Sequence, residues 1–329
     1  MARKVMQAVQ YHGYGGGVAG LKYVEVPVPS PKSDEVLVKV EATALNAVDW
    51  KIQKGNIRPF LPRKFPCIPG SDVAGEVVEV GSGVQNFKAG DKVVAMLNWF
   101  YGGGLAEFAA SSEKLTVKLP PEISASHAAG LNIAGLTALQ ALTEVAGVKL
   151  DGSVNTKNIL ITAASSGVGH YAVQLAKLGN THITATCGAR NLEFVRNLGA
   201  DEVIDYKTPE GAALKSPSGR KYDAVIHCAT GTPWSTFEPN LSEYGQVIDL
   251  SPNASALWTS TVQKLTLSKK KLVPLLGKPK GENLEFLVSL VKEGKLKTVV
   301  DSTFPLSNAK DAWAKILDGH ATGKIIVEP

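Results

Sequence analysis

The sequence predicts an α/β protein in which a doubly wound parallel sheet is joined to a second, mostly antiparallel β domain. Residues 1–120 consist of short β-branched runs separated by Gly, Pro and Asp. After Pro120 and Pro121, apolar strand-like runs alternate with amphipathic helical segments. This alternation is typical of a parallel sheet with helices on both faces, and the length of 329 residues suits two domains.

The first half is expected to form antiparallel strands, because its apolar runs are short and are divided by turn residues. The expected strands are residues 5–10, 22–29, 35–45, 72–81 and 91–97. A helix is expected at 135–147, where GLTALQALTEVAG has helical apolar spacing.

The second half is expected to supply the parallel strands and the helices between them. The strands are predicted at 158–164, 182–187, 202–205, 223–228, 246–250 and 271–276, with helices notably at 168–179 and 191–199, each closed by a glycine. A last helix with Ser307 as its N-cap precedes a strand at 324–328. A lone final strand is expected to rejoin the first domain.

Composition excludes several classes of protein. A net charge of +5 is too small for a dedicated nucleic-acid binder, although it is compatible with phosphate binding or contact with an anionic membrane. Three distant cysteines form neither a disulfide framework nor a CxxC motif and favour a reducing compartment. No apolar run is long enough to span a membrane, and no cleaved leader is expected. The run SKKK at 268–271 is interpreted as a solvated turn or, alternatively, a phosphate or membrane contact.

The stretch ITAASSGVGH at 161–170 has the form of a strand, a tight turn and the start of a helix. Ala163, Ser166 and Gly169 occupy the three small-residue positions of a dinucleotide-binding turn, and Gly167 adds a flexible backbone position. The N–H groups of the helix start favour a pyrophosphate, so a Rossmann unit is predicted. His170 is expected to face the cofactor or cap the helix; the alternative is an exposed polar residue.

The segment after the next strand favours NADP(H) over NAD(H). An acidic residue about 20 positions beyond the turn usually binds the ribose of NAD. Twenty residues after Gly167 stands Cys187, and no carboxylate lies between Ser165 and Asn191. Arg190 is placed to meet a 2′-phosphate. Its alternative role is an exposed arginine at a helix start.

The chain resembles the medium-chain dehydrogenase/reductase superfamily, specifically its zinc-free quinone oxidoreductase branch, over nearly its whole length. The matching segments are NAVDWKIQKG at 46–55, PCIPGSDVAGEVVEVG at 66–81, GDKVV at 90–94, GGGLAEFAA at 102–110, AGLTALQAL at 134–142, SSGVGHYAVQLAK at 165–177, LGADEVIDY at 198–206 and GKIIV at 323–327. YGGG, TCGARN and GHATGKIIVEP also resemble the chloroplast-envelope members from plants.

The resemblance implies a GroES-like catalytic domain at 1–125 and 279–329 and a Rossmann NADP(H)-binding domain at 126–278. It also implies a homodimer and a peripheral location at the chloroplast inner envelope without a cleaved transit peptide.

The same resemblance assigns roles to individual residues. Asn46 and Lys51 are expected near the nicotinamide end, Thr137 near the nicotinamide ribose or the phosphates, and Ser165, Ser166, Gly167, Val168 and Gly169 at the pyrophosphate. Cys187, Arg190 and Tyr206 are expected around the 2′-phosphate, Cys228, Ala229, Leu250 and Ser251 along the nicotinamide ribose, and Gly323 and Lys324 at the site from the catalytic domain.

No metal is expected. Zinc-dependent members of the superfamily carry a cysteine and a His–Glu pair in segments where this chain has Asn46–Asp49 and Ser71–Asp72. The six histidines show no ligand spacing. Tyr101 and Lys51 are candidate catalytic proton donors by location; alternatively Tyr101 is a loop aromatic, Lys51 only binds cofactor, and the proton comes from water or a cofactor hydroxyl.

The expected reaction is hydride transfer from NADPH to a lipophilic, electron-poor carbonyl compound. By resemblance to envelope members, the first hypothesis is reduction of the activated C=C bond of long-chain enones, including γ-ketols, and the second is quinone reduction. A different class stays open: a non-catalytic NADPH-binding, RNA-binding or structural protein. Nothing in the sequence resembles an RNA module, so no nucleic-acid partner is expected.

Overall fold

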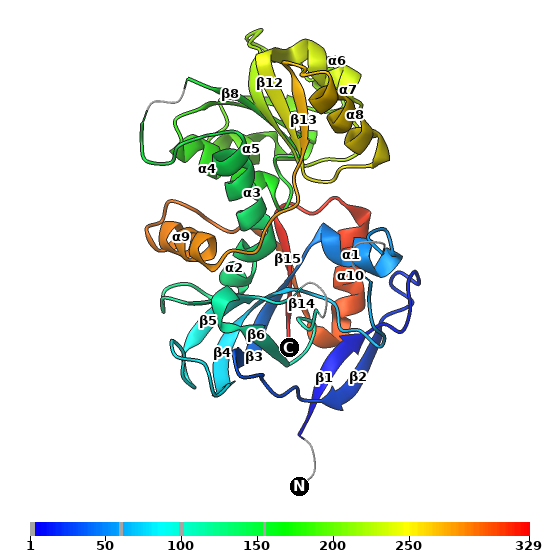
Figure 1. Cartoon of the computed structure of the whole chain (residues 1–329), viewed down its shortest axis with the longest axis vertical. Helices are drawn as coiled ribbons and strands as arrows, with labels where there is room; N and C mark the ends of the chain where they lie inside the picture. The colour runs from blue at the N-terminus through cyan, green and yellow to red at the C-terminus, as the bar shows by residue number, and fades with distance from the viewer. Residues whose placement is uncertain (1–3, 59–61, 99–101, 154–155) are drawn as a thin grey trace. The chain divides into compact units, whose positions relative to one another are not determined.

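The computed structural model describes residues 4–58, 62–98, 102–153 and 156–329 (Figure 1). The chain divides into two compact units. The first comprises Met1–Leu136 and Pro279–Pro329, and the second comprises Thr137–Lys278.

The first unit is built on antiparallel β structure. Its strands are β1 (Val5–Gln10), β2 (Lys22–Pro27), β3 (Glu35–Leu45), β4 (Asp72–Val80), β5 (Lys92–Met96), β6 (Phe108–Ser112), β7 (Thr116–Lys118), β14 (Val300–Pro305) and β15 (Lys324–Glu328). β1 pairs with β2, while the larger sheet has the order β14-β15-β3-β4-β5-β7 with β6 on β3. Among the strands of the described residues of this unit, β14 and β15 pair parallel and the other pairs are antiparallel. The pairing of β15 with β3 confirms that the last strand rejoins the N-terminal domain.

Helices of the first unit are α1 (Ala47–Lys54), α2 (Ala125–Ala129), α9 (Gly281–Lys292) and α10 (Ala309–Asp318). α10 packs Ala312 and Trp313 into a core with Leu45, Ile325 and Val327, so the C-terminal helix and strand stabilise the end of β3. The expected N-cap at Ser307 is wrong. After Pro305 the chain first forms a 3₁₀ turn, Leu306–Asn308, and Asn308 is the residue that precedes the helix.

The second unit is a doubly wound parallel sheet with the order β10-β9-β8-β11-β12-β13 (Figure 1). Its strands are β8 (Asn158–Thr162), β9 (His182–Cys187), β10 (Glu202–Asp205), β11 (Tyr222–His227), β12 (Leu241–Asp249) and β13 (Lys271–Pro274). The helices are α3 (Leu136–Gln140), α4 (Gly169–Leu178), α5 (Leu192–Asn197), α6 (Pro209–Ala212), α7 (Trp234–Phe237) and α8 (Ala254–Leu265). Strand order reverses between β8 and β11, which is where ligands bind in such sheets.

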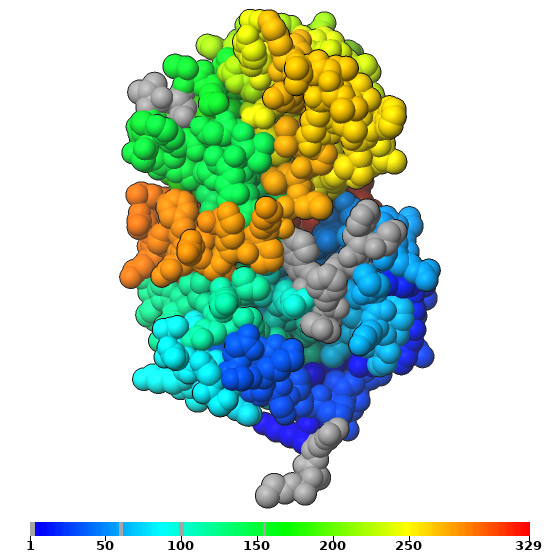
Figure 2. Space-filling model, in the orientation of Figure 1, coloured from blue at the N-terminus to red at the C-terminus, as the bar shows by residue number. Residues whose placement is uncertain are grey.

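Helix α8 has an unusual distribution of side chains. It buries Ser260 and Gln263, whereas Trp258 and Leu265 are 71% and 80% exposed. Gln263 accepts a hydrogen bond from Leu272 N at 2.6 Å, which explains the polar inner face. The segment containing α8 lies on the visible surface of its unit, in yellow (Figure 2). Within the described ranges, no helix is long and apolar enough to cross a membrane.

Candidate functional site

The turn after β8 is held by Ser166. Ala163 has a φ of 48°, and its carbonyl accepts a hydrogen bond from Ser166 N at 2.9 Å. The hydroxyl of Ser166 accepts a hydrogen bond from Gly169 N at 3.2 Å. The side chain that replaces a glycine in this turn therefore points back to the start of α4 and satisfies one of its N–H groups.

Gly169 allows α4 to approach β8 closely. A Cβ atom at this position would lie 2.3 Å from the Ala163 carbonyl oxygen and 2.7 Å from Ala164 Cα. Within the described part of the chain, the N–H groups of Gly167 and Val168 have no partner. Unpaired N–H groups at the start of a ten-residue helix fit a pyrophosphate, so the turn has the features that a dinucleotide requires.

His170 is fully buried, so the alternative of an exposed polar residue is wrong. Its Nδ1 lies 3.0 Å from the Ser166 carbonyl oxygen, to which a protonated Nδ1 donates. The backbone N–H of His170 donates to the same oxygen at 3.1 Å. The imidazole therefore bonds to the turn that the sequence motif predicts, and its expected role in facing the cofactor or capping the helix stays a prediction.

Positive side chains gather at the ends of β9 and β10. Arg190 is exposed in the 3₁₀ turn Ala189–Asn191. Tyr206 is 45% exposed, and Lys207 Nζ lies 5.8 Å from its ring centroid. Sequence reasoning missed Lys207, although a lysine directly after the strand EVIDY was a usable signal. The two cations and the aromatic ring suit an adenosine carrying a 2′-phosphate.

Cys187 ends β9 with its thiol inside the unit and its carbonyl bonded to the backbone that follows β10. The side chain is buried, and burial together with the nearby Asp205 carboxylate raises its pKa to about 11. Its carbonyl oxygen accepts a hydrogen bond from Tyr206 N at 3.1 Å. The protonated thiol therefore packs as a small apolar group inside the unit.

The first residues of the loops after β11 and β12 are hydrogen-bonded to residues of the sheet. Cys228 N donates to Thr162 Oγ1 at 3.1 Å, and Leu250 N donates to the His227 carbonyl at 3.3 Å. Ser251 N donates to Asp249 Oδ1 at 2.9 Å. The expected residues Cys228, Ala229, Leu250 and Ser251 thus lie at the carboxyl ends of adjacent strands. Sequence reasoning missed Thr162, His227 and Asp249.

Thr137 lies in α3, near the segment that follows β13. A Cβ atom on Gly277 would lie 3.1 Å from the Thr137 hydroxyl oxygen. Gln140 of the same helix holds this segment through two hydrogen bonds, since its Nε2 donates to the Lys278 carbonyl and its Oε1 accepts from Lys278 N. The start of α3 and the Gly277 backbone are therefore in close contact.

The first unit brings together Asn46, Asp72 and Lys324. Asn46 Nδ2 donates to Asp72 Oδ2 at 2.7 Å, and Lys324 Nζ donates to Asn46 Oδ1 at 2.6 Å. Lys324 also donates to the Leu45 carbonyl at 3.1 Å, and its Nζ is 4.0 Å from Asp72 Oδ2. All three side chains are at most 6% exposed. Asn46 and Asp72, which lie in the segments where the resemblance sets zinc ligands in other members, are thus bonded to each other, and Asn46 is also bonded to Lys324.

Burial controls the charges of this cluster. Loss of solvation raises the pKa of Asp72 to about 7, although Lys324 opposes that change, and burial lowers the pKa of Lys324. Burial also raises the pKa of Asp49 to about 6. Asp49 accepts a hydrogen bond from Asn46 N at 2.7 Å, which fixes the start of α1.

Of the other predicted residues of this unit, Lys51 and Gly323 belong to the described chain. Lys51 is half-buried on α1, with its ammonium 5.9 Å from the Trp50 ring centroid. Gly323 has a φ of 89°, and a Cβ there would lie 2.2 Å from the Val299 carbonyl oxygen, so only glycine fits. Tyr101 lies outside the described residues.

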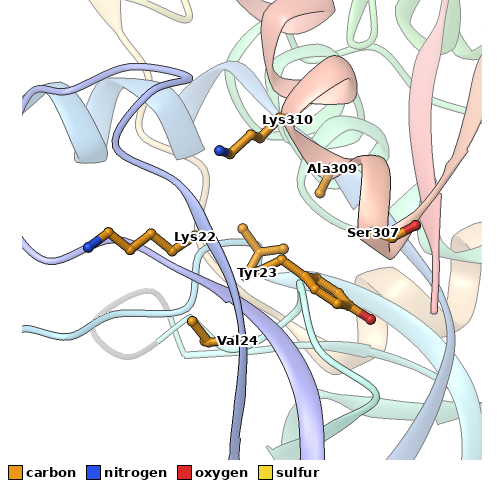
Figure 3. Close-up of a pocket in the computed structure, with 7 residues that line it drawn as sticks. Lys22, Tyr23, Val24, Ser307, Ala309 and Lys310 are labelled. Carbon is orange, nitrogen blue, oxygen red and sulfur yellow. The ribbon is translucent and has the colours of Figure 1, made fainter.

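Among residues 4–58, 62–98, 102–153 and 156–329, no group of three or more His, Cys, Asp or Glu side chains could hold a metal ion. A pocket of about 470 Å³ lies between β2 and the start of α10 (Figure 3). Its lining residues are Val9, Lys22, Tyr23, Val24, Ser307, Ala309 and Lys310. None of the predicted site residues lines it, so it is separate from the candidate site.

Comparison with known proteins agrees with this fold. Residues 32–121 match the family model described as "Alcohol dehydrogenase GroES-like domain", and residues 198–327 match "Zinc-binding dehydrogenase". With full-length relatives far above 30% identity, the chain belongs to the medium-chain dehydrogenase/reductase superfamily, in its quinone oxidoreductase family. It is an oxidoreductase.

The individual relatives are similar from end to end. The chain is 73% identical to the "Chloroplast envelope quinone oxidoreductase homolog" of Arabidopsis thaliana and 68% identical to "Quinone-oxidoreductase QR1, chloroplastic" of Triphysaria versicolor, with 100% of each chain covered. The solved quinone oxidoreductase from Coxiella burnetii is 32% identical, with a TM-score of 0.88, covering 99% of this chain and 100% of that one.

Proposed function

We propose that this chain is an NADPH-dependent reductase that transfers hydride to the activated C=C bond of lipophilic α,β-unsaturated ketones. The observation that carries the proposal is the turn at Ala163–Gly169, whose backbone fits a pyrophosphate. When bound, NADPH supplies the hydride. Quinone reduction is the second candidate, supported by the names of the full-length chloroplast relatives.

The preference for NADPH over NADH is supported by Arg190 and Lys207 at the ends of β9 and β10. Arg190→Glu is expected to raise the Kd of NADPH at least about tenfold and to change that of NADH little, because only NADPH carries the 2′-phosphate. Arg220→Glu is the control, since it makes the same charge change at an exposed residue before β11. Equal effects of Arg190→Glu on both cofactors would contradict the assignment.

The enone preference is supported by more distant relatives. The chain is 35% identical to "NADPH-dependent alkenal/one oxidoreductase, chloroplastic" of Arabidopsis thaliana, covering 99% of this chain and 80% of that one. An electron-poor acceptor needs orientation and some polarisation of its carbonyl, which fixed donors provide. NADPH oxidation should be measured with long-chain enones and with quinones. Faster turnover of quinones would reverse the ranking, and NADPH binding without turnover would favour a non-catalytic role.

Zinc independence is proposed from the buried cluster. The Asn46 amide is already bonded to Asp72 and Lys324, so these groups satisfy one another without a metal ion. Activity is expected to survive dialysis against a strong chelator, with metal content followed by elemental analysis. Loss of activity that zinc restores would refute this part of the proposal.

Contact with an anionic membrane at the chloroplast envelope is supported by the exposed apolar face of α8. The neighbouring SKKK run contributes less, because Lys269 pairs with Glu243 and Lys270 Nζ donates to the Glu238 carbonyl at 2.7 Å. These contacts favour the solvated-turn interpretation. Vesicle flotation with anionic lipid tests the membrane contact, and a protein that does not float would reject it. Light scattering tests the homodimer expected from the resemblance, and a monomer would reject that expectation.

A further inference from the structure

Three polar side chains form a buried row across the sheet of the second unit. Thr162, His227 and Asp249 end β8, β11 and β12 and are 3%, 2% and 8% exposed. In the parallel register, His227 lies beside Thr162 on one strand and beside Asp249 on the other. Register partners share a face of the sheet, so the three residues lie side by side. Buried polar side chains must be hydrogen-bonded, because burial removes their bonds to water.

The row connects the strands to the loops that follow them. Thr162 Oγ1 lies 2.9 Å from His227 Nδ1 and accepts the Cys228 N–H at 3.1 Å. Asp249 Oδ1 accepts the Ser251 N–H at 2.9 Å. Thr162 and Asp249 therefore bond the first residues of the loops after β11 and β12. The position of Cys228 in particular depends on a hydroxyl of the adjacent strand.

The strand order indicates which part of a dinucleotide these loops meet. The pyrophosphate belongs at the turn after β8, and the cations for the adenosine lie at the ends of β9 and β10 on one side of it. β11 and β12 lie on the other side of β8. A dinucleotide extends across the reversal of strand order, so its nicotinamide half must pass over the ends of β11 and β12.

We infer that Thr162, supported by His227, is a positioning residue for the nicotinamide half of the cofactor. Its hydroxyl fixes the backbone of Cys228, and with it the loop that lies under the nicotinamide ribose. The inference rests on the proposed use of NADPH, but it adds a residue that does not touch the cofactor. His227 acts through Thr162, and Phe237 packs edge-on to the imidazole with ring centroids 4.9 Å apart.

The charge of His227 suits this role. Burial lowers the pKa of the imidazole, and the Asp249 carboxylate on β12 opposes this change. A neutral ring shares one hydrogen bond with the Thr162 hydroxyl through Nδ1, and the same hydroxyl oxygen accepts the Cys228 N–H.

Thr162→Val and Thr162→Ser provide a matched test, since valine keeps the shape of threonine without its hydroxyl and serine keeps the hydroxyl. Affinities should be measured for NADPH and for 2′-phospho-ADP-ribose, which lacks the nicotinamide. Thr162→Val is expected to weaken NADPH binding about tenfold and leave the fragment within about twofold. Thr162→Ser is expected to bind both like the wild type.

A second pair covers the case in which Thr162→Val does not fold. His227→Asn keeps a hydrogen-bonding atom near the position of Nδ1 and is expected to retain NADPH affinity, whereas His227→Leu is expected to lose it selectively. Equal losses of NADPH and fragment affinity, or no loss of either, would overturn the inference. Should the wild type bind the fragment and NADPH equally weakly, the proposed cofactor itself would be wrong, which distinguishes the two failures.

Discussion

Replacement of Gly169 by alanine tests the geometry of the cofactor turn directly. The new Cβ atom would lie 2.3 Å from the Ala163 carbonyl oxygen, at least 0.7 Å closer than the 3.0 Å below which real Cβ atoms are essentially never found. The next neighbours, Ala164 Cα at 2.7 Å and Ala164 C at 2.9 Å, are also backbone atoms and cannot rotate away. Helix α4 must therefore move off β8.

The expected change in the free energy of unfolding of Gly169→Ala follows from two opposing effects. Overpacking against backbone costs about 3 kcal/mol or more. Alanine in a helix recovers up to about 1 kcal/mol relative to glycine. We therefore expect Gly169→Ala to lower the free energy of unfolding by about 2 kcal/mol and to weaken NADPH binding, because the N–H groups of Gly167 and Val168 move with the helix.

Urea unfolding and titration of NADPH measure the two effects separately. Gly188→Ala is the matched control in the neighbouring strand end, since its Cβ would meet only Tyr206 Cε1, at 3.6 Å, and its φ of −77° suits any residue. That variant should have the free energy of unfolding of the wild type. The close-packing argument would be refuted by a Gly169→Ala variant with wild-type stability and NADPH affinity.

Three further predictions concern single side chains. Ser166→Gly removes the hydroxyl that accepts the Gly169 N–H, so it is expected to lower the free energy of unfolding by a few tenths of a kcal/mol and to leave NADPH affinity nearly intact. Ser166→Leu should abolish NADPH binding measured by calorimetry. Tight binding by the leucine variant would show that the turn is misplaced. Burial raises the pKa of Asp49 from its usual 3.8 to about 6, so the folded state holds the carboxyl proton more tightly than the unfolded state. The stabilisation of the fold by this proton is therefore complete below about pH 4 and is lost as the pH rises through 6. Relative to Asp49→Asn, wild-type stability should fall by about 3 kcal/mol between pH 4 and 7 in urea titrations, and parallel pH profiles would exclude this explanation. Burial and the nearby Asp205 carboxylate raise the pKa of Cys187 to about 11, so iodoacetamide at pH 7.5 should modify this thiol much faster in the unfolded chain than in the native protein, as read by mass spectrometry; equal rates would contradict its burial.

The bounds of several strands could be predicted from the local pattern of apolar residues. Strands β3, β9 and β10 have the bounds predicted from their apolar runs, because long or strongly β-branched segments carry a clear periodicity. β6, β7 and β14 were not predicted, since FAASS, TVK and VDSTFP are short or polar and form strands only where a partner edge is available. β12 begins at Leu241 rather than 246, beyond an irregularity in its pairing with β11 that spacing does not reveal.

The cofactor turn was determined by the sequence itself, because its small residues, its strand and its helix are contiguous and their spacing limits the backbone directly. Tertiary structure decided the rest of the site. Asn46, Asp72 and Lys324 are far apart in the chain, and only the pairing of β15 and β4 with β3 brings their side chains together. The row of Thr162, His227 and Asp249 likewise depends on the order and register of three parallel strands. Such contacts leave no local pattern, because they are fixed by strand pairing across the sheet rather than by neighbouring residues.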